Sequence, residues 1–257
     1  MGNKQVTLST VRNTIRLLQE FSKGEPELGI TELSRRLGLT KSAVYRIVKT
    51  LEEEKVVYKN AKTNKYQLGL KMFEIGSVIF NEMEISQVAI PMIEKVKSKL
   101  AGDIHLATYD QGDIIYLLRL GQKKKTWLKI GRRIRSHTNA AGKLLLAFQE
   151  DEEIQRVIST NLEKYTHKTI TCPATLLKEL KKIRTKGYAT SAEEFVENVY
   201  SIAVPIYNDS GTVIAAISLT RETPFPEYQT KEIVRELQLC SKLITENMGV
   251  NRYNDVP

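Results

Sequence analysis

Cationic and hydroxyl-bearing side chains within residues 40–49 have the chemistry that recognition of duplex nucleic acid requires. They are Thr40, Lys41, Ser42, Tyr45, Arg46 and Lys49. An arginine can donate two parallel hydrogen bonds to guanine, a lysine neutralises phosphate, and hydroxyls bond to phosphate or to base edges. At helical spacing the opposite face is aliphatic and consists of Val44, Ile47, Val48 and Leu51. The pattern therefore predicts a helix capped by Thr40 that packs with one face and contacts DNA with the other.

Two preceding segments are expected to hold this helix in place. Residues 10–22 carry apolar side chains at three- and four-residue spacing, which predicts a helix with one buried stripe formed by Val11, Ile15, Leu18 and Phe21. A second helix is expected after an N-cap at Thr31, burying Leu33 and Leu37 and ending at Gly38. Two short helices joined through a glycine-containing turn are typical of a helix-turn-helix, whose second helix enters the major groove.

A basic hairpin is predicted directly after these helices. Val56–Tyr58 and a return segment through Tyr66 and Leu68 alternate like two short strands around a turn at residues 60–64. Three lysines surround the turn, namely Lys59, Lys62 and Lys65. Beside a recognition helix such a hairpin forms a wing, and its lysines act as point charges on phosphate.

The positive charge of the chain is concentrated in this region. The 257 residues carry a formal net charge of +9, and residues 1–71 contain 14 Lys/Arg against 7 Asp/Glu, so +7 lies there and +2 in the remainder. Localised positive charge is typical of phosphate binding. Taken alone, the charge or the split helix is equally compatible with a solvated basic surface. The agreement of three helices, a basic hairpin and the charge distribution favours DNA binding.

The same residues are similar to those of a known family. The run from "TLSTVRNTIRLLQEF" through "LTKSAVYRIVKTL" to "KYQLGLKMFEIG" resembles the N-terminal winged helix-turn-helix of the IclR family of bacterial transcriptional regulators. "HTNAAGKLLLAF" (137–148) and "KGYATSAEEFVENVYSIAVPIYNDSGTVIAAISLT" (186–220) resemble two stretches of that family's effector domain. The chain departs from the family where Glu54-Lys55 replace a glycine before the wing, and where "EFVENVYS" lacks a glycine after the acidic pair.

The resemblance implies a winged helix-turn-helix domain at 1–69, a linker helix at 70–84 and an effector-binding domain at 85–257. Helical spacing of apolar residues independently predicts the linker helix, through Leu70, Phe73, Val78, Ile79 and Met83. These side chains could pack within the chain. The resemblance implies instead that they pair two chains, giving a homodimer or homotetramer on a palindromic operator.

The C-terminal part has the pattern of an α+β domain on a largely antiparallel sheet. Strand-like runs at 103–110, 113–121, 188–191, 202–207 and 212–220 alternate with helix-like runs at 88–100, 151–158, 175–186 and 228–247 and the helix at "AAGK". Tight turns at Gln111-Gly112 and "NDSG" join strand neighbours. The resemblance implies that this domain is similar to the GAF and PAS folds.

The resemblance also implies an effector pocket on one face of that sheet, closed by the loop carrying Glu193 and Glu194. The matching positions are Ala140, Ala141, Ser191, Val199 and Ser201. With Asn139, the two alanines begin a helix whose free N–H groups favour a carboxylate. Tight helix-sheet packing is the alternative role for the alanines, and satisfying strand ends is the alternative for the serines.

Two further sets of residues are weaker candidates for the pocket. Arg132, Arg133 and Arg135 could attract an anionic effector, but a solvated loop is the favoured interpretation. His105, Tyr116 and Trp127 could line the cavity, although an aromatic or histidine in a strand is more often part of a core.

An enzyme is the main alternative class, and the sequence lacks its motifs. There is no GxSxG, HExxH, GxGxxG or P-loop, and neither the histidines nor Cys172 and Cys240 have metal-ligand spacing. Glu193 and Glu194 are adjacent on an extended chain, so they are expected to point to opposite faces. We therefore expect no catalytic set, no metal and no cofactor. The absence of a long apolar run predicts no membrane segment and a cytoplasmic location.

Together these features predict a DNA-binding transcriptional regulator controlled by a small organic acid or sugar acid. Repression of catabolic genes is the expected role, although the sequence leaves activation open. An enzyme or a constitutive DNA-binding protein of the same fold is the alternative.

Overall fold

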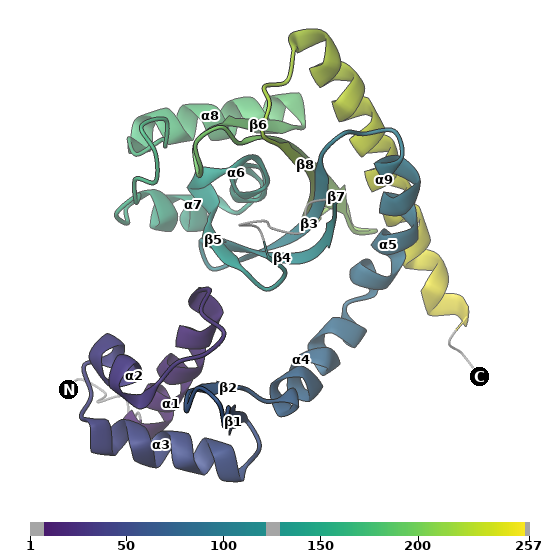
Figure 1. Cartoon of the computed structure of the whole chain (residues 1–257). Coiled ribbons are helices and arrows are strands. Elements are labelled where there is room, and N and C mark those ends of the chain that lie inside the picture. Colours follow the sequence, from purple (N-terminus) through teal and green to yellow (C-terminus); the bar gives the residue numbers. More distant parts are fainter. Residues whose placement is uncertain (1–7, 122–128, 255–257) are drawn as a thin grey trace, which may run out of the picture. The chain divides into compact units, whose positions relative to one another are not determined.

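The computed structural model describes residues 8–121 and 129–254 (Figure 1). Contacts divide the chain after Glu82 into two compact units, which we call the N-terminal unit (1–82) and the C-terminal unit (83–257). Apolar clusters form a separate core within each unit.

The N-terminal unit contains the predicted helix-turn-helix and hairpin. Its elements are α1 (Ser9–Glu20), η1 (Phe21–Lys23), α2 (Ile30–Leu37), α3 (Lys41–Glu53), β1 (Val57–Lys59), β2 (Tyr66–Leu68) and α4 (Leu70–Glu82). Leu17 of α1, Leu33 of α2, and Val44 and Val48 of α3 are fully buried against one another and against the hairpin residue Tyr66. The aliphatic face predicted for α3 is therefore the face that packs.

The buried stripe predicted for α1 was wrong at Val11 and Ile15 but right at Phe21. Val11 and Ile15 are 52% and 53% exposed, whereas Leu17 is fully buried and Phe21 nearly so. Residues 15 and 17 lie on nearly opposite sides of a helix, so α1 is apolar on two sides. Spacing alone does not tell which side packs within the chain, and contact with α2 selects the side of Leu17.

The predicted start of α2 was also wrong. Gly29 precedes the helix in an extended conformation, and Thr31 lies within the first turn and is exposed. The predicted end is confirmed, because Gly38 adopts a left-handed conformation with a φ of 67°. The predicted cap of α3 is confirmed too, since the Thr40 hydroxyl accepts a hydrogen bond from the Ala43 N–H at 3.3 Å.

The wing, which we define as β1, β2 and residues 60–65 between them, is tied to the chain before α2. Its strands pair in antiparallel register, and Leu28 forms a further backbone bridge to Tyr66. The Glu27 carboxylate accepts hydrogen bonds from Asn60 Nδ2 at 2.7 Å and from Thr63 Oγ1 at 2.8 Å. These contacts hold the turn of the wing in one position relative to α3.

Lys55→Gly is expected to raise the free energy of unfolding of the N-terminal unit by about 0.5–1 kcal/mol. Lys55 has a φ of 60°, a left-handed conformation that strains a side chain with a Cβ, at the position where the family pattern has a glycine. The greater freedom of glycine in the unfolded chain offsets part of the gain. Lys59→Gly in strand β1 is the control and is expected to destabilise. Calorimetry of the full chain measures both changes, and a loss of stability in both variants would contradict the expectation.

The described residues of the C-terminal unit form one six-stranded antiparallel sheet in the order β5-β4-β3-β8-β7-β6. The elements are α5 (Glu84–Lys97), β3 (Asp103–Asp110), β4 (Asp113–Leu120), β5 (Arg133–Arg135), η2 (Ser136–Thr138), α6 (Ala140–Ala147), α7 (Asp151–Ile158), α8 (Pro173–Lys186), β6 (Ala189–Ala192), β7 (Tyr200–Tyr207), β8 (Val213–Arg221) and α9 (Glu227–Asn254). This is the predicted α+β class.

Helices cover both faces of the sheet, which curls around α6 (Figure 1). Alternation along the strands separates two cores. Ile104 and Leu106 of β3 pack with the cluster of α5 and α9, whereas Ala107 packs with the cluster of α6, α7 and α8. The face toward α6 carries small and polar residues in β7 and β8, among them Ser201 and Ser218, and this leaves room for the helix and for a cavity.

The prediction of a solvated loop for the arginine-rich segment was wrong. Arg133–Arg135 form the edge strand β5, which pairs with β4 in antiparallel register. Ile134 is buried in the α6 core, while the two flanking arginines are exposed. One inward-facing apolar residue between two outward-facing charged residues is the shortest alternating strand pattern. Among so many arginines this pattern is difficult to recognise in the sequence.

Candidate functional site

The recognition face, which we define as Lys41, Ser42, Tyr45, Arg46 and Lys49, lies on the exposed side of α3. Tyr45 is 51% exposed, and Arg46 has no side-chain partner among the described residues. Lys49 is the exception, because its Nζ pairs with Glu52 at 3.1 Å. Thr40, at the start of the helix, is exposed and in hydrogen-bond contact with Ser42. The face thus presents one arginine, two lysines and hydroxyls to solvent.

The wing adds three exposed cations to those of α3. The arginines of α2 contribute less, because they are paired with carboxylates. Lys59, Lys62 and Lys65 are all exposed. On α2, by contrast, Arg35 and Arg36 both bond to Glu32, and these hydrogen bonds lower the pKa of Glu32 to about 2. The positive charge available for phosphate therefore lies on α3 and the wing.

A small, partly open cavity lies between the sheet and the β6–β7 loop of the C-terminal unit, and we call it the sheet cavity. It is lined by Tyr116, Asn139, Ser191, Phe195, Val196, Val199, Ser201 and Thr220. Its free space is about 10 Å³, at the lower limit for a single water molecule. Hydroxyls and an amide line the side of the sheet and α6, whereas apolar residues of the loop line the other side. None of these eight residues carries a charge.

The structure brings four of the six predicted effector residues together at this cavity. They are Asn139, Ser191, Val199 and Ser201. Ser191 and Ser201 lie directly opposite each other in the β6–β7 register. The Ser201 hydroxyl accepts the Ala140 N–H at 3.3 Å, and Asn139 Oδ1 accepts the Gly142 N–H at 2.9 Å. Two N–H groups at the start of α6 are thus already bonded to side chains that line the cavity.

The other two predicted residues lie beside the cavity. Ala140 and Ala141 are buried in the core between α6 and the sheet and are not among the lining residues. Their small size lets the first turn of α6 approach the strands closely. The start of α6 also approaches η2 closely at Gly142, where a Cβ would lie 2.3 Å from the Ser136 carbonyl oxygen.

The two adjacent glutamates of the loop point apart as predicted, but the extended chain expected there was wrong, because Glu193 adopts a left-handed conformation with a φ of 61°. Glu193 accepts hydrogen bonds from Lys168 and from the Tyr200 hydroxyl, and these contacts lower its pKa to about 2. Glu194 turns inward, and its Oε1 lies 2.6 Å from the Nζ of Lys143 on α6. Lys143 is 1% exposed, and burial raises the pKa of Glu194 against the influence of the lysine. This buried ion pair ties the cavity's loop to α6.

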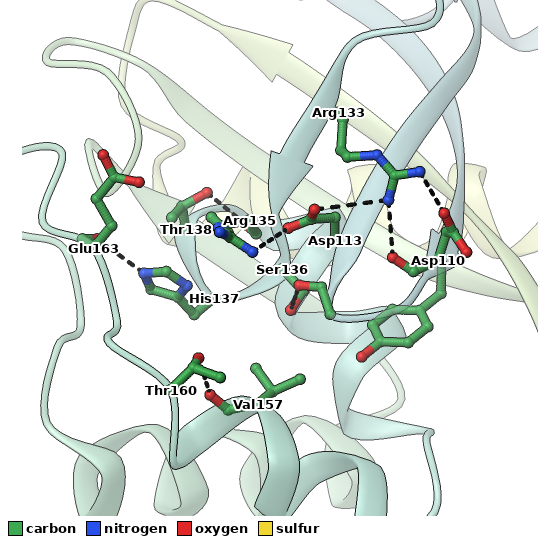
Figure 2. A network of polar contacts seen from close by, with 12 residues as sticks. Asp110, Asp113, Arg133, Arg135, Ser136, His137, Thr138, Val157, Thr160 and Glu163 are labelled. Atoms are coloured by element: carbon green, nitrogen blue, oxygen red, sulfur yellow. Dashed lines mark hydrogen bonds and ion pairs between the residues drawn. The ribbon is translucent and has the colours of Figure 1, made fainter. Parts of the chain in front are cut away.

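Arginines of the predicted anion-attracting group are engaged with aspartates. Figure 2 shows Arg133 bonded to Asp110 and near Asp113, and Arg135 bonded to Asp113 at 3.2 Å. In the same network His137 Nε2 lies 3.0 Å from the Glu163 carbonyl oxygen. These contacts fix η2, which immediately precedes Asn139. These pairs position the start of α6, whereas the third arginine of the group, Arg132, lies over the ring of the lining residue Phe195, 5.5 Å from its centroid.

Sequence patterns missed half of the cavity lining. Phe195, Val196 and Thr220 were not predicted, and Tyr116 was treated as a core residue first. Of the other weaker candidates, His105 is buried near Tyr116, whereas Trp127 lies outside the described residues. Thr220 could have been identified only from the strand register, which brings it opposite Ser201.

Acid is expected to destabilise the C-terminal unit through its buried histidines. Burial lowers the pKa of His105 from 6.5 to about 4 and also lowers the pKa of His137. Below pH 6.5 the unfolded chain therefore binds more protons than the folded chain, so stability present above that pH is lost as the pH falls toward 4. For His105 alone, urea denaturation at pH 7.5 and pH 5 is expected to differ by about 2 kcal/mol.

The pH dependence is tested by comparing two substitutions of the same kind. His105→Leu is expected to remove about 2 kcal/mol of the stability difference between pH 7.5 and pH 5. The nearby charges of Asp103 and Arg119 have smaller effects on His105 than its burial has. His167→Leu, at an exposed histidine, is expected to leave it unchanged. If the His105 variant kept the full acid sensitivity, the assignment to this buried imidazole would be wrong.

Membrane and metal sites were searched across the described residues. No helix in residues 8–121 and 129–254 combines the length and apolarity needed to cross a bilayer. The same residues contain no group of three or more His, Cys, Asp or Glu side chains placed to hold a metal ion.

Comparisons with known proteins agree with this architecture. The model of the IclR helix-turn-helix domain matches residues 10–61, and the model of the bacterial transcriptional regulator IclR C-terminal region matches residues 78–246. The HTH-type transcriptional regulator KdgR of Escherichia coli (strain K12) is 31% identical over 255 residues, covering 98% of this chain and 95% of that protein. The HTH-type transcriptional repressor AllR of the same strain is 29% identical over 209 residues, covering 80% of this chain and 77% of that protein.

Solved structures show the same fold. An IclR homolog from Microbacterium hydrocarbonoxydans, complexed with 4-hydroxybenzoate, covers 94% of this chain and 100% of that chain with a TM-score of 0.82 at 24% identity. The C-terminal domain of E. coli KdgR covers 65% of this chain and 99% of that chain with a TM-score of 0.59 at 30% identity. The chain thus belongs to the IclR family of DNA-binding transcriptional regulators, non-enzymatic proteins with an effector-binding C-terminal domain.

Proposed function

We propose that the protein represses catabolic genes and that a small carboxylate in the sheet cavity sets its affinity for a palindromic operator. The observation that carries the proposal is the presence, in one chain, of a cationic recognition helix and a polar cavity at a helix N-terminus. A constitutive DNA-binding protein has no need of the cavity. The repressor AllR among the relatives supports the sign of regulation.

Each unit has a defined part in the proposal. In a winged helix-turn-helix domain of residues 1–69, Arg46 reads a base edge while the other residues of the recognition face, Thr40 and the wing lysines hold phosphates. In an effector domain of residues 85–257, the ligand carboxylate lies at the positive end of the α6 dipole, near Asn139, Ala140 and Ala141, and contacts Ser191, Val199 and Ser201. The homologue complexed with 4-hydroxybenzoate, itself a carboxylate, supports the class of ligand.

Residues 70–84 act as a linker that pairs two copies of the chain. Exposed large apolar side chains crowd α4, namely Leu70, Phe73, Ile75, Val78, Ile79 and Phe80. A helix that exposes so many large apolar side chains is typical of a protein interface. A dimer built on α4 carries two recognition faces to successive major grooves, and pairs of dimers give a tetramer.

Reciprocal binding measurements on the full chain test the proposal. Fluorescence anisotropy with DNA from upstream of its own gene measures operator affinity while small carboxylates are titrated. An effector is expected to change that affinity about 5- to 150-fold, and operator DNA must change the effector's affinity by the same factor. If the chain bound the operator equally well with every carboxylate, it would be a constitutive binder. Sedimentation of the chain checks the dimer.

A further inference from the structure

A buried histidine lies in the sheet without a hydrogen-bond partner. His105 is 1% exposed, in the middle of β3, and neither Nδ1 nor Nε2 has a partner among the described residues. A buried polar group without a partner costs free energy, so such groups are rare and usually have a reason. No contact within the described residues supplies that reason for His105.

His105 lies on the cavity side of the sheet. Its neighbours Ile104 and Leu106 pack under α5 and α9, so strand alternation directs residue 105 toward α6. The ring of His105 meets the ring of Tyr116 edge-on, with centroids 5.2 Å apart, and Tyr116 lines the sheet cavity. In the β3–β8 register His105 is opposite Ser218, two residues before the lining residue Thr220. The imidazole therefore lies in the floor between two residues that line the cavity.

The chemistry of this floor suits neutral hydroxyl groups. Because the pKa of His105 is lowered to about 4, the ring is neutral at pH 7, with one nitrogen that donates and one that accepts. Tyr116, Ser191, Ser201 and Thr220 add four side-chain hydroxyls on the same side. A ligand with several hydroxyls can satisfy such a set, whereas an acid without hydroxyls would leave the imidazole unpaired.

We infer that His105 is a ligand-binding residue of the sheet cavity and that the effector is a polyhydroxylated carboxylic acid. Its carboxylate lies at the start of α6, and its hydroxyls bond to His105, Tyr116 and Thr220. Since the free space of the cavity is only about 10 Å³, the ligand separates the loop residues Phe195 and Val199 from the sheet as it enters. The inference rests on the proposed function and narrows its ligand class.

Calorimetric titration of the full chain with four named acids tests the inference. D-gluconate and D-galacturonate carry hydroxyls, whereas benzoate and hexanoate lack them. We expect at least one hydroxylated acid to bind, and His105→Leu to weaken that binding at least 10-fold. His105→Gln keeps a donor and an acceptor and is expected to retain most of the affinity. Tyr116→Phe is expected to weaken binding about 5-fold, and the control His167→Leu should leave it unchanged.

Three results would overturn the inference: unchanged affinity of the hydroxylated acid for a folded His105→Leu chain, tighter binding of benzoate or hexanoate than of both hydroxylated acids, or no binding of any of the four. Any residual binding of hexanoate should be the same in wild type and His105→Leu, which separates a lost ligand contact from a general distortion. Fluorescence anisotropy of operator DNA in the same samples distinguishes a failure of this inference from a failure of the proposed function. Operator release by another carboxylate would refute the ligand class alone, whereas failure to bind any operator would refute the proposed function.

Discussion

Replacing Lys143 with methionine is expected to lower the free energy of unfolding of the C-terminal unit by about 3–5 kcal/mol. The Nζ of Lys143 lies 2.6 Å from Glu194 Oε1, and both side chains are buried. Methionine keeps the length of the side chain but leaves the carboxylate buried without its counter-charge. The other carboxylate oxygen of Glu194, Oε2, offers no substitute contact, because it is buried and has no hydrogen-bond partner among the described residues. Urea denaturation followed by far-UV circular dichroism measures the loss.

Two further variants separate the buried ion pair from the loss of a positive charge. Lys182→Met removes an exposed lysine of α8 that pairs with Glu179, and it is expected to change stability by less than about 1 kcal/mol. The double variant Lys143→Met with Glu194→Met places two apolar side chains in contact, so most of the lost stability should return. If Lys143→Met were as mild as Lys182→Met, the contact would not carry the stability assigned to it.

The same ion pair connects stability to the effector site. Glu194 belongs to the loop whose next residues, Phe195 and Val196, form the apolar wall of the sheet cavity. Lys143 belongs to α6, whose start carries Asn139 on the opposite wall. The pair therefore ties the loop wall of the cavity to α6. A ligand that moves the loop away from the sheet must either leave the Lys143–Glu194 contact intact or form contacts that replace it.

The DNA-binding part could be predicted from the sequence because its signals are local. The cap at Thr40, the split face of α3 and the turn of the wing each depend on residues within a few positions of one another, and the structure has all three. The buried side of α1 could not be predicted in the same way. Leu17 and Ile15 are equally apolar, and only the packing partner distinguishes them.

The cavity could be predicted only in part because its geometry depends on distant pairing. Ser191, Ser201 and Thr220 form one row across β6, β7 and β8, and that row follows from strand register, which composition does not specify. Lys143 and Glu194 are 51 positions apart, and each is a residue type that is almost never fully buried unless paired. Spacing in the sequence gives no sign of such a pair.

Arg46→Ala is expected to weaken operator binding about 5- to 150-fold, equivalent to about 1–3 kcal/mol, and to relax specificity at one base pair. Arg46 lies on the exposed face of α3, and no described residue competes for its guanidinium. Its planar fork is suited to guanine, whereas a wing lysine offers only a point charge to phosphate. Anisotropy with the operator and with single-base variants of it measures both the loss and its dependence on sequence.

Two matched variants distinguish a base contact by Arg46 from a phosphate contact and from the loss of positive charge alone. Lys62→Ala in the wing is expected to weaken binding to all sequences alike and to reduce the slope of log affinity against log salt by about 1. Arg235→Ala removes an exposed arginine from α9 and lowers the net charge by the same amount. Because that helix belongs to the other unit, its variant should keep both affinity and specificity. If Arg46→Ala lost affinity equally on every sequence, as expected for Lys62→Ala, Arg46 would be a phosphate contact, and another residue of the recognition face would have to read the bases.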